Sequence, residues 1–363
     1  MAQILITSKD STETLGSLIS HNKWDRILLV TGKRSYEISG SKDYIEKECS
    51  NIDIQLSRFS DFQNNPNIDD LRKGIVFAEK FVPDAIIAIG GGSVMDMGKL
   101  IRFFYTHDGE ILSGSYNTNS NKVPLIAVPT TAGTGSEATH FAVLYDEEKE
   151  KHSISSPEIL PEYVILRPEL TYNQSSYLTA CAGFDALAQS IEAYWNKNAT
   201  VESDAYAERA MKLLYDTLPK VVKKPTPELR EKMSEGAYWA GRAINITKTT
   251  APHAFSYPFT SHYRIPHGHA VALTFPYIAD FNFSRGYIPE QRKTALCTLL
   301  ETSCNIYTTL KNYILAIGLV MPVNKYDPNL ILRGISLERL ANNPANINSD
   351  DALAIINKVI GRI

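Results

Sequence analysis

The stretch "DAIIAIGGGSVMDMGKL" at residues 84–100 decides the fold. It opens with a short, continuous apolar run, which is typical of a parallel strand buried on both faces. Gly90, Gly91 and Gly92 follow directly, and without Cβ atoms they let the backbone approach a ligand closely. A helix is expected next, with Ser93 as its cap, and its free N–H groups favour an anion such as a pyrophosphate. The stretch predicts a nucleotide-binding turn, although a tight turn without a ligand would look the same.

The same strand pattern occurs on both sides of this stretch. "RILLVTG" (26–32) and "VPLIAVPTT" (123–131) are short apolar runs that end at Gly or Pro. Between the first run and residues 84–92, apolar residues recur at helical spacing. Alternating strands and helices predict an α/β nucleotide-binding domain with a parallel sheet.

The pattern changes after about residue 170. Segments such as "TVESDAYAERAMKLLYDTLPKVV" (200–222) and "PELREKMSEGAYWAGRAINI" (227–246) are long and amphipathic at helical spacing. We therefore expect a Rossmann-like NAD(P)-binding domain at 1–170 and an all-helical metal- and substrate-binding domain at 171–363.

Composition narrows the class of protein. The chain has 363 residues, 44% of them hydrophobic and 21% charged, with a net charge of −3. This balance is that of an ordinary globular protein and gives no sign of a nucleic-acid or membrane-surface partner. The opening residues lack a secretory pattern, and the four cysteines are scattered, so we expect a cytoplasmic protein with reduced thiols.

A second polar loop follows the strand at 123–131. "VPTTAGTGSEAT" (128–139) contains Thr130 and Thr131, and its glycines lead to Ser136. Two such loops after neighbouring strands favour one elongated ligand such as a dinucleotide. The alternative is two unrelated polar turns.

A third loop, "VTGKRSY" (30–36), indicates which dinucleotide. An acid near the adenosine ribose accepts from the 2′-hydroxyl and would repel a 2′-phosphate. Gly32, Lys33, Arg34 and Ser35 offer donors and no carboxylate, which favours NADP(H). A solvated basic turn is the alternative.

The helical half carries a candidate metal site. In "GFDALAQSIEAYW" (183–195), Asp185 and Gln189 stand one turn apart on one face of an expected buried helix. Residues 247–271 hold four of the eight histidines. Asp185 with His253 and His267 would supply oxygen and nitrogen ligands to a Lewis-acidic divalent ion. Hydrogen-bonded core histidines are the alternative.

These motifs together resemble a known family. "GGGSVMDMGK", "PTTAGTGSE", "GFDALAQSIEAY" and "PHG" occur in the order found in iron-containing (group III) alcohol dehydrogenases. The resemblance covers nearly the whole chain, including "NNPN" near 64–67 and "ANNPANI" near its end. It implies a Rossmann-like α/β domain that binds NAD(P), an all-α domain that carries a metal (the dehydroquinate synthase-like fold), a small aldehyde or alcohol substrate and a homodimer.

The resemblance also assigns site residues. The metal ligands fall on Asp185, His253, His267 and, where the family normally has histidine, Gln189. The resemblance implies Fe or Zn, and because an amide oxygen is a weak ligand for these ions, Ni or Mn are further candidates. The family's ribose-side aspartate falls on Gly32, which again favours NADP(H) over NAD(H). The remaining residues that it places against the cofactor are Asn65, Ser93, Asp96, Thr130, Thr131, Ser136, Thr139 and Lys151.

Three residues bear on catalysis and substrate. Tyr257 occupies a position where many members have histidine, as a candidate catalytic group or a packing residue. Arg242 and Lys248 would suit an anionic substrate, and the motifs resemble the branch that reduces phosphonoacetaldehyde to 2-hydroxyethylphosphonate. If both cations instead pair with acids such as Glu235, a generic short-chain aldehyde is the expected substrate.

Two competing interpretations remain at the level of sequence. Dehydroquinate synthases and glycerol-phosphate dehydrogenases share the architecture, but "TTAGTGSE" and "PHG" favour the alcohol dehydrogenases. The second competing interpretation is a non-catalytic NADP-binding relative whose metal site has been lost through Gln189.

Overall fold

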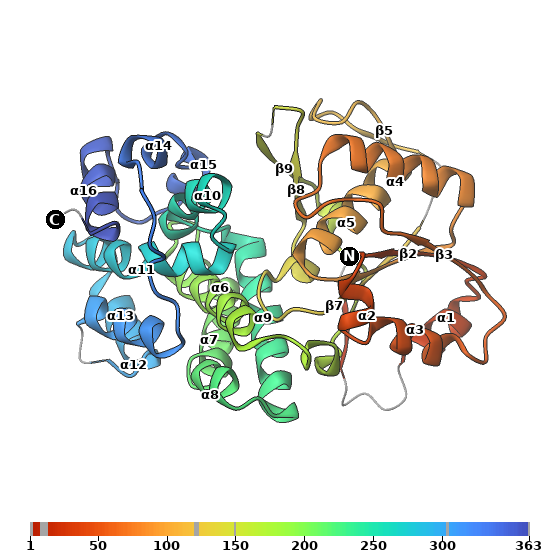
Figure 1. The fold of residues 1–363 in the computed structure, drawn as a ribbon, viewed down its shortest axis with the longest axis horizontal. Coiled ribbons are helices and arrows are strands. Elements are labelled where there is room, and N and C mark those ends of the chain that lie inside the picture. Colours follow the sequence, from red (N-terminus) through yellow and green to blue (C-terminus); the bar gives the residue numbers. More distant parts are fainter. Residues whose placement is uncertain (1–2, 8–13, 120–122, 149, 303–304, 362–363) are drawn as a thin grey trace. The chain divides into compact units, whose positions relative to one another are not determined.

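The computed structural model describes residues 3–7, 14–119, 123–148, 150–302 and 305–361. It divides into two compact units, labelled by element in Figure 1. The first comprises Met1–Thr131 and Ser136–Asn173, and the second comprises Ala132–Gly135 and Gln174–Ile363. The predicted boundary at residue 170 did not anticipate that the loop Ala132–Gly135 belongs to the second unit.

The first unit is built on a six-stranded sheet whose strands all run parallel. Three of its strands match the predicted apolar runs, and the predicted α/β fold is confirmed. In sheet order, the strands are β1 (Ile4–Ile6), β10 (Tyr163–Ile165), β7 (Leu125–Pro129), β4 (Ala85–Gly90), β2 (Arg26–Thr31) and β3 (Gln55–Phe59).

Helices cover both faces of this sheet (Figure 1). Alternate strand residues such as Ile27, Leu29 and Ile87 pack with helical residues such as Ile19 and Tyr44 in one buried core. On the other face, α5 packs so closely that a Cβ at Gly98 would lie 2.5 Å from the Ala88 Cβ. The helices are α1 (Leu15–Asn22), α2 (Ser35–Ile38), α3 (Ser41–Cys49), α4 (Ile68–Phe81) and α5 (Gly92–Thr106).

Smaller elements complete the first unit. β8 (Phe141–Tyr145) and β9 (Lys151–Ser155) form an antiparallel hairpin, and residue 149 lies outside the described residues. The others are β5 (His107–Asp108), β6 (Asn117–Thr118), η1 (Ser136–Ala138), η2 (Pro157–Ile159) and η3 (Pro168–Thr171).

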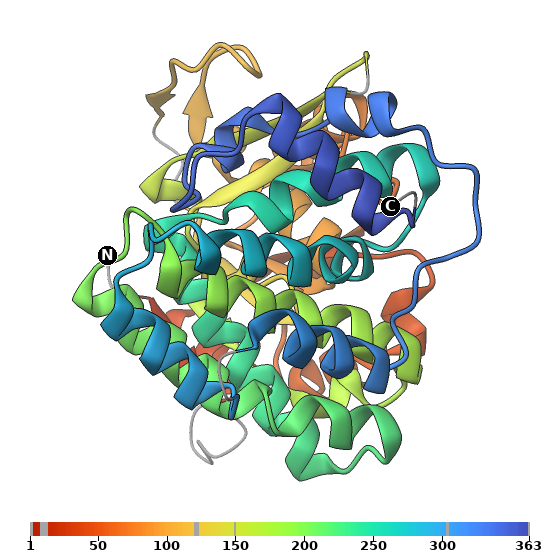
Figure 2. The same cartoon turned by 90° about the vertical axis from the view of Figure 1, so that its left-hand side faces the viewer.

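The second unit consists of helices and the loops that connect them, with no strand among its described residues, which confirms the predicted all-α half. Figure 2 looks onto this unit, where α16 in dark blue packs with α11 in a shared apolar core. Its helices are α6 (Ser176–Trp195), α7 (Val201–Leu214), α8 (Thr217–Lys223), α9 (Pro227–Thr247), α10 (Ala251–Tyr263), α11 (His267–Ser284), α12 (Glu290–Leu299), α13 (Ile306–Ala316), α14 (Pro328–Arg333), α15 (Leu337–Leu340) and α16 (Ser349–Val359).

Two further expectations can be compared with the structure. None of the described helices is long and apolar enough to cross a bilayer. Cys49, Cys181 and Cys297 are buried thiols, and Cys304 lies outside the described residues.

Candidate active site

The two glycine loops of the first unit meet at the carboxyl edge of the sheet. Gly90 and Pro129 pair across β4 and β7, and the Thr130 N–H donates to the Gly90 carbonyl at 2.9 Å. A Cβ at Gly91 would lie 3.3 Å from the Thr131 Cγ2, so the loops are in direct contact. This juxtaposition was predicted from the sequence, because the carboxyl ends of parallel strands share one edge of a sheet.

The "NNPN" loop and the hairpin reach the same edge. The Asn65 N–H donates to the Ser93 Oγ at 3.1 Å, which places this loop beside the start of α5. The sequence predicted Ser93 as the cap of α5, and this is wrong: Gly91 is the N-cap and provides no side-chain hydrogen bond. Lys151 lies close enough to lower the pKa of Asp96 electrostatically, although burial outweighs it and raises that pKa. Contact of these residues with a cofactor stays a prediction.

A buried lysine that the sequence did not single out organises this edge. The Lys99 Nζ donates to Ser136 Oγ, Thr139 Oγ1 and the Phe141 carbonyl, each at 2.9 Å. Ser136 Oγ in turn donates to Asp96 at 2.8 Å. Burial lowers the pKa of Lys99 to about 8. The hydroxyls of Ser136 and Thr139 therefore hold the loop in shape, and the "MGKL" lysine one turn beyond Asp96 was the sequence signal for this network.

The third loop sits beside α5 as well. A Cβ at Gly32 would lie 2.1 Å from the Ser35 Oγ, so a larger residue there would require the Ser35 hydroxyl to rotate away. Lys33 forms an exposed ion pair with Asp61 at 3.2 Å. Arg34 is the N-cap residue of α2 and makes no capping hydrogen bond with its side chain. The turn itself carries the two cations, with the Asp61 carboxylate against one of them, and its contact with a cofactor stays a prediction.

The second unit brings together the three predicted metal ligands. Asp185 on α6, His253 on α10 and His267 on α11 offer ligand atoms that all lie within 4.8 Å of one another. The Asp185 Oδ1 lies 3.1 Å from His253 Nε2 and 3.8 Å from His267 Nε2. Asp185 and His253 are each 3% exposed, whereas the His267 side chain is 35% exposed. The donor set and its partly open side suit a divalent ion with room for a substrate oxygen.

Glu192, which the sequence reasoning missed, completes this cluster. Its fully buried carboxylate hydrogen-bonds His253 Nδ1 and accepts from the N–H and hydroxyl of Thr250. Burial alone would lower the pKa of His253, but the Glu192 and Asp185 carboxylates outweigh it and raise that pKa to about 10. A metal-binding imidazole is commonly oriented in this way by a carboxylate on its other nitrogen. Positions 185, 189 and 192 share one helical face, and this spacing was the available signal.

Gln189 lies on the same face of α6 but presents its amide nitrogen to its neighbours. Nε2 donates to the Thr134 carbonyl at 3.2 Å, and the amide hydrogen-bonds Asp185. Oε1 is buried and has no hydrogen-bond partner. A buried amide oxygen left unpaired costs about 1–3 kcal/mol, so a cation that accepted it would relieve that cost. Its role as a metal ligand stays a prediction.

The other aromatic and imidazole groups of this region have distinct surroundings. The Tyr257 ring stacks on His267, with centroids 5.9 Å apart and planes 18° apart. His269 is buried between the Tyr177 hydroxyl and the Val320 carbonyl, each at 2.9 Å. His262 is exposed at the end of α10. Tyr257 therefore borders the metal cluster, whereas His262 and His269 do not belong to it.

The two predicted substrate cations already have partners. Arg242 donates to the hydroxyls of Tyr206 and Tyr238 at 3.1 and 3.3 Å, and not to Glu235. Lys248 forms an ion pair with Glu338 at 3.0 Å, with both side chains about half exposed.

The backbone at Lys248 is strained. Its φ of 61° and ψ of −179° belong to a region that only glycine adopts readily. Such a conformation costs about 1–3 kcal/mol and is found most often at functional sites.

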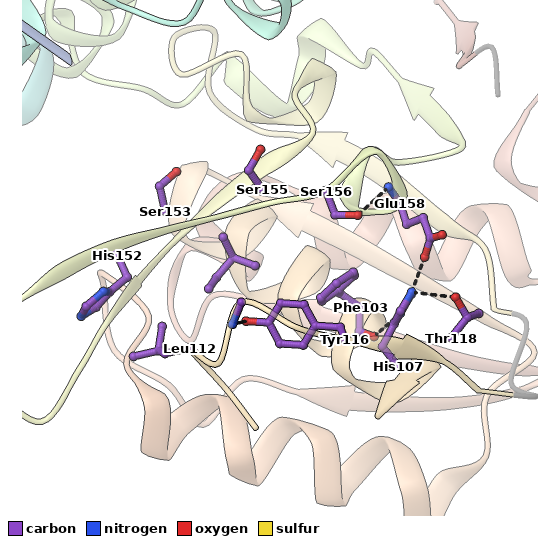
Figure 3. Close-up of a pocket in the computed structure, with 12 residues that line it drawn as sticks. Phe103, His107, Leu112, Tyr116, Thr118, His152, Ser153, Ser155, Ser156 and Glu158 are labelled. Carbon is purple, nitrogen blue, oxygen red and sulfur yellow. Dashed lines mark hydrogen bonds and ion pairs between the residues drawn. The ribbon is translucent and has the colours of Figure 1, made fainter. Parts of the chain in front are cut away.

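A cavity of about 540 Å³ lies in the first unit away from these residues (Figure 3). Phe103 and Tyr116 form its aromatic wall, and His107 is held in it by Thr106 and Glu158. None of the predicted cofactor or metal residues lines this cavity.

Comparison with known proteins adds an independent observation. A family model described as "Iron-containing alcohol dehydrogenase" matches residues 2–168. A second, described as "Fe-containing alcohol dehydrogenase family, C-terminal", matches residues 179–360.

Individual relatives agree with these models. Aldehyde-alcohol dehydrogenase 2 from Entamoeba histolytica is 29% identical over 77% of this chain, which spans 35% of that protein. The NAD-dependent methanol dehydrogenase of Bacillus methanolicus is 31% identical over 76% of this chain and 74% of its own length. The crystal structure of sulfoacetaldehyde reductase from Bifidobacterium kashiwanohense in complex with NAD+ has a TM-score of 0.88 at 28% identity, covering 99% of this chain and 98% of that one.

Proposed function

The chain belongs to the iron-containing alcohol dehydrogenase family, and from this premise we propose that it catalyses metal-assisted, NAD(P)H-dependent reduction of a small aldehyde to an alcohol. The observation that carries the proposal is the cluster of Asp185, His253 and His267, in which the first two residues are buried and His267 is partly exposed. The motifs had pointed to this family, and the family models confirm it.

The residues of the second unit fit a divalent metal. Asp185, His253 and His267 would hold it, with Gln189 as the candidate fourth ligand through its unpaired oxygen. Fe or Zn suits a mixed oxygen and nitrogen set, and Ni or Mn are further candidates. When bound, such an ion supplies Lewis acidity that polarises a carbonyl.

The protein's own groups would prepare the reaction. Glu192 fixes the ring of His253 so that Nε2 faces Asp185. Tyr257, stacked on the half-exposed His267, is the candidate catalytic group that hydrogen-bonds the substrate oxygen or relays a proton to it.

The cofactor that we propose is NADP(H) in preference to NAD(H). When bound, it supplies the hydride. Gly90, Gly91 and Gly92 with Thr130 and Thr131 would cradle the pyrophosphate at the edge of the sheet.

The preference for NADP(H) rests on the turn at 32–35, which carries two cations and no carboxylate. A structural relative at 28% identity was crystallised with NAD+, so the preference is a property that we propose for this chain and not for the family.

The substrate that we propose is a short anionic aldehyde, with phosphonoacetaldehyde and its product 2-hydroxyethylphosphonate as the best candidates. The related reductase is named for sulfoacetaldehyde, an aldehyde that carries a sulfonate. Lys248 is the better candidate for the anionic tail, because an exposed ion pair with Glu338 is worth only about 0–1 kcal/mol and is readily exchanged. Arg242, held by two tyrosines, would support it. We also propose a cytoplasmic homodimer.

A metal titration with an aldehyde panel tests this function. Chelated protein is supplied with Fe²⁺, Zn²⁺, Ni²⁺ or Mn²⁺, and NADPH oxidation is followed with phosphonoacetaldehyde, sulfoacetaldehyde and acetaldehyde. Turnover that requires a metal and is fastest with an anionic aldehyde supports the proposal. No turnover with any combination would favour a non-catalytic NADP-binding protein, and equal turnover of all three would favour a generic aldehyde reductase.

Variants of Lys248 separate its charge from its backbone strain. Lys248→Ala should raise KM about tenfold for an anionic aldehyde and hardly at all for acetaldehyde. Lys248→Gly should do the same while raising the free energy of unfolding by about 1 kcal/mol, because glycine adopts this backbone without strain. Equal changes in KM for both aldehydes would rule out a role in holding the tail.

A further inference from the structure

The turn at 32–35, which the proposed function places at the adenosine ribose, is braced by a cation from a different strand. Arg58 on β3 donates from Nε to Thr31 Oγ1 at 2.7 Å. Its Nη2 donates to the carbonyls of Gly32 and Lys33, each at 3.0 Å. The guanidinium also lies over the Tyr36 ring, 4.5 Å from its centroid. Because β2 and β3 pair in parallel with Leu29 opposite Arg58, the side chain reaches forward to the carboxyl edge.

These contacts make Arg58 a fixed charge. Three hydrogen bonds and an aromatic face hold the guanidinium in one orientation, so little side-chain entropy remains to be lost when a ligand binds. Among the described residues, no hydrogen bond uses Nη1, and the residue is exposed. A planar donor held in place and open to solvent is the arrangement that phosphate recognition favours.

The neighbouring cations are less suited to this task. Lys33 is about half exposed and shares its charge with Asp61 at 3.2 Å. Arg34 is exposed at the N-cap position of α2, and no side-chain hydrogen bond holds its guanidinium among the described residues. Neither side chain is held as Arg58 is.

The turn itself carries no acid that would oppose a phosphate, because glycine stands at position 32. A Cβ there would meet Ser35 Oγ at 2.1 Å, so a larger residue would require the Ser35 hydroxyl to rotate away. The carbonyls of the turn are held by Arg58.

We propose that Arg58 is the residue that discriminates NADP(H) from NAD(H), by placing a pre-oriented guanidinium at the 2′-phosphate. This inference rests on the proposed cofactor and names a residue outside the predicted loop. Lys33 and Arg34 add charge around the same phosphate, but Arg58 sets the preference.

Binding measurements on the full chain test this without metal or aldehyde. Dissociation constants for NADPH and NADH are measured by nicotinamide fluorescence, and 2′-AMP and 5′-AMP are used as competitors. Arg58→Met keeps the length of the side chain and removes its charge, Arg58→Lys keeps the charge and removes the planar fork, and Lys33→Met tests the neighbouring cation of the turn for comparison.

We expect wild type to prefer NADPH and 2′-AMP. Arg58→Met should weaken NADPH binding about tenfold to a hundredfold and NADH binding less than twofold. The loss of NADPH binding in Arg58→Lys should lie between that of wild type and that of Arg58→Met. Lys33→Met should weaken NADPH binding less than threefold.

The contrary outcomes are distinct. Equal losses for NADPH and NADH in both Arg58 variants would mean that Arg58 only braces the turn, and a larger effect of Lys33→Met would make Lys33 the phosphate ligand. Wild-type preference for NADH would overturn the NADP(H) proposal and this inference together. Retained NADPH preference in Arg58→Met would overturn this inference alone.

Discussion

Two acid–histidine clusters in this molecule look alike by composition but differ in what surrounds them. Asp185 with two histidines on the helices, and Asp146 with Glu150 and His152 on the hairpin, each offer ligand atoms within 4.8 Å of one another. On the hairpin, the Asp146 carboxylate already accepts from the Glu150 N–H and pairs with His152, each at 2.7 Å.

The helical cluster is different because it is buried and holds excess acceptors. Asp185 and Glu192 both face His253, and the Gln189 oxygen has no hydrogen-bond partner. Buried acceptors without enough donors are stabilised by a cation, whereas a satisfied turn gains little from one. Proximity of ligand residues therefore identifies candidates, and burial with unmet hydrogen-bonding capacity distinguishes between them.

The sharpest test of this difference is to remove the acid from each cluster in turn. Asp185→Ala should abolish stoichiometric metal binding and lower aldehyde reduction at least about a thousandfold, because the anionic ligand and the Lewis acid are lost together. Asp146→Ala should leave metal content and turnover unchanged. Metal analysis of dialysed protein and NADPH oxidation measure both, and loss of metal in Asp146→Ala would break the comparison.

Glu137 shows what burial does to a carboxylate that belongs to neither acid–histidine cluster. Burial raises the pKa of Glu137 to about 7, with the Lys99 charge opposing it less strongly. Since the folded pKa lies above the unfolded value of 4.5, the folded state binds more protons, and stability is lost as pH rises from about 4.5 through about 7. Glu137→Gln should remove this loss, worth about 3 kcal/mol by pH 8.

Urea unfolding of wild type and Glu137→Gln at pH 5 and pH 8 measures that effect. Relative to wild type, Glu137→Gln should have a higher free energy of unfolding at pH 8 but not at pH 5. Glu46→Gln, on the exposed face of α3, is the control and should show no such difference. A pH-independent difference would mean that Glu137 is ionised in both states.

The fold and much of the site could be predicted because short-range patterns encode them. The strands β2, β4 and β7 are buried on both faces and therefore read as continuous apolar runs. The edge strand β3, "QLSRF", is mostly exposed and β1 has only three residues, so neither produced such a run.

Residues whose role depends on a distant partner were harder to predict. Helical spacing after Asp96 and Asp185 offered a signal for Lys99 and Glu192, but only the fold brings them to Ser136 and His253. Arg58 gives no such signal, because its contact with Thr31 depends on the pairing of two strands. Ser93 was the expected cap because serine commonly caps helices, but Gly91 takes that place since α5 begins at Gly92, two residues earlier than a Ser93 cap implies.

Glu192→Gln tests whether the helical cluster needs its second carboxylate. The amide keeps the size of the side chain but removes the charge that orients and polarises His253. Metal affinity should fall about tenfold to a hundredfold, as for other outer carboxylates of metal sites. Competition with a chromophoric chelator measures this, with Glu208→Gln on the exposed face of α7 as the control. An unchanged affinity would show that Glu192 serves only to bind Thr250.

Gln189→His is expected to have the smallest effect, and in the opposite direction. An imidazole one turn after Asp185 replaces a neutral amide oxygen, which is a weak ligand, with a strong nitrogen ligand. Affinity for Fe²⁺ or Zn²⁺ should rise about tenfold in the same chelator competition. Gln189→Leu removes the amide without adding a ligand and should not bind metal more tightly than wild type. If the histidine variant also binds no more tightly, the buried Oε1 does not face the ion, and the amide serves Asp185 and the Thr134 carbonyl instead.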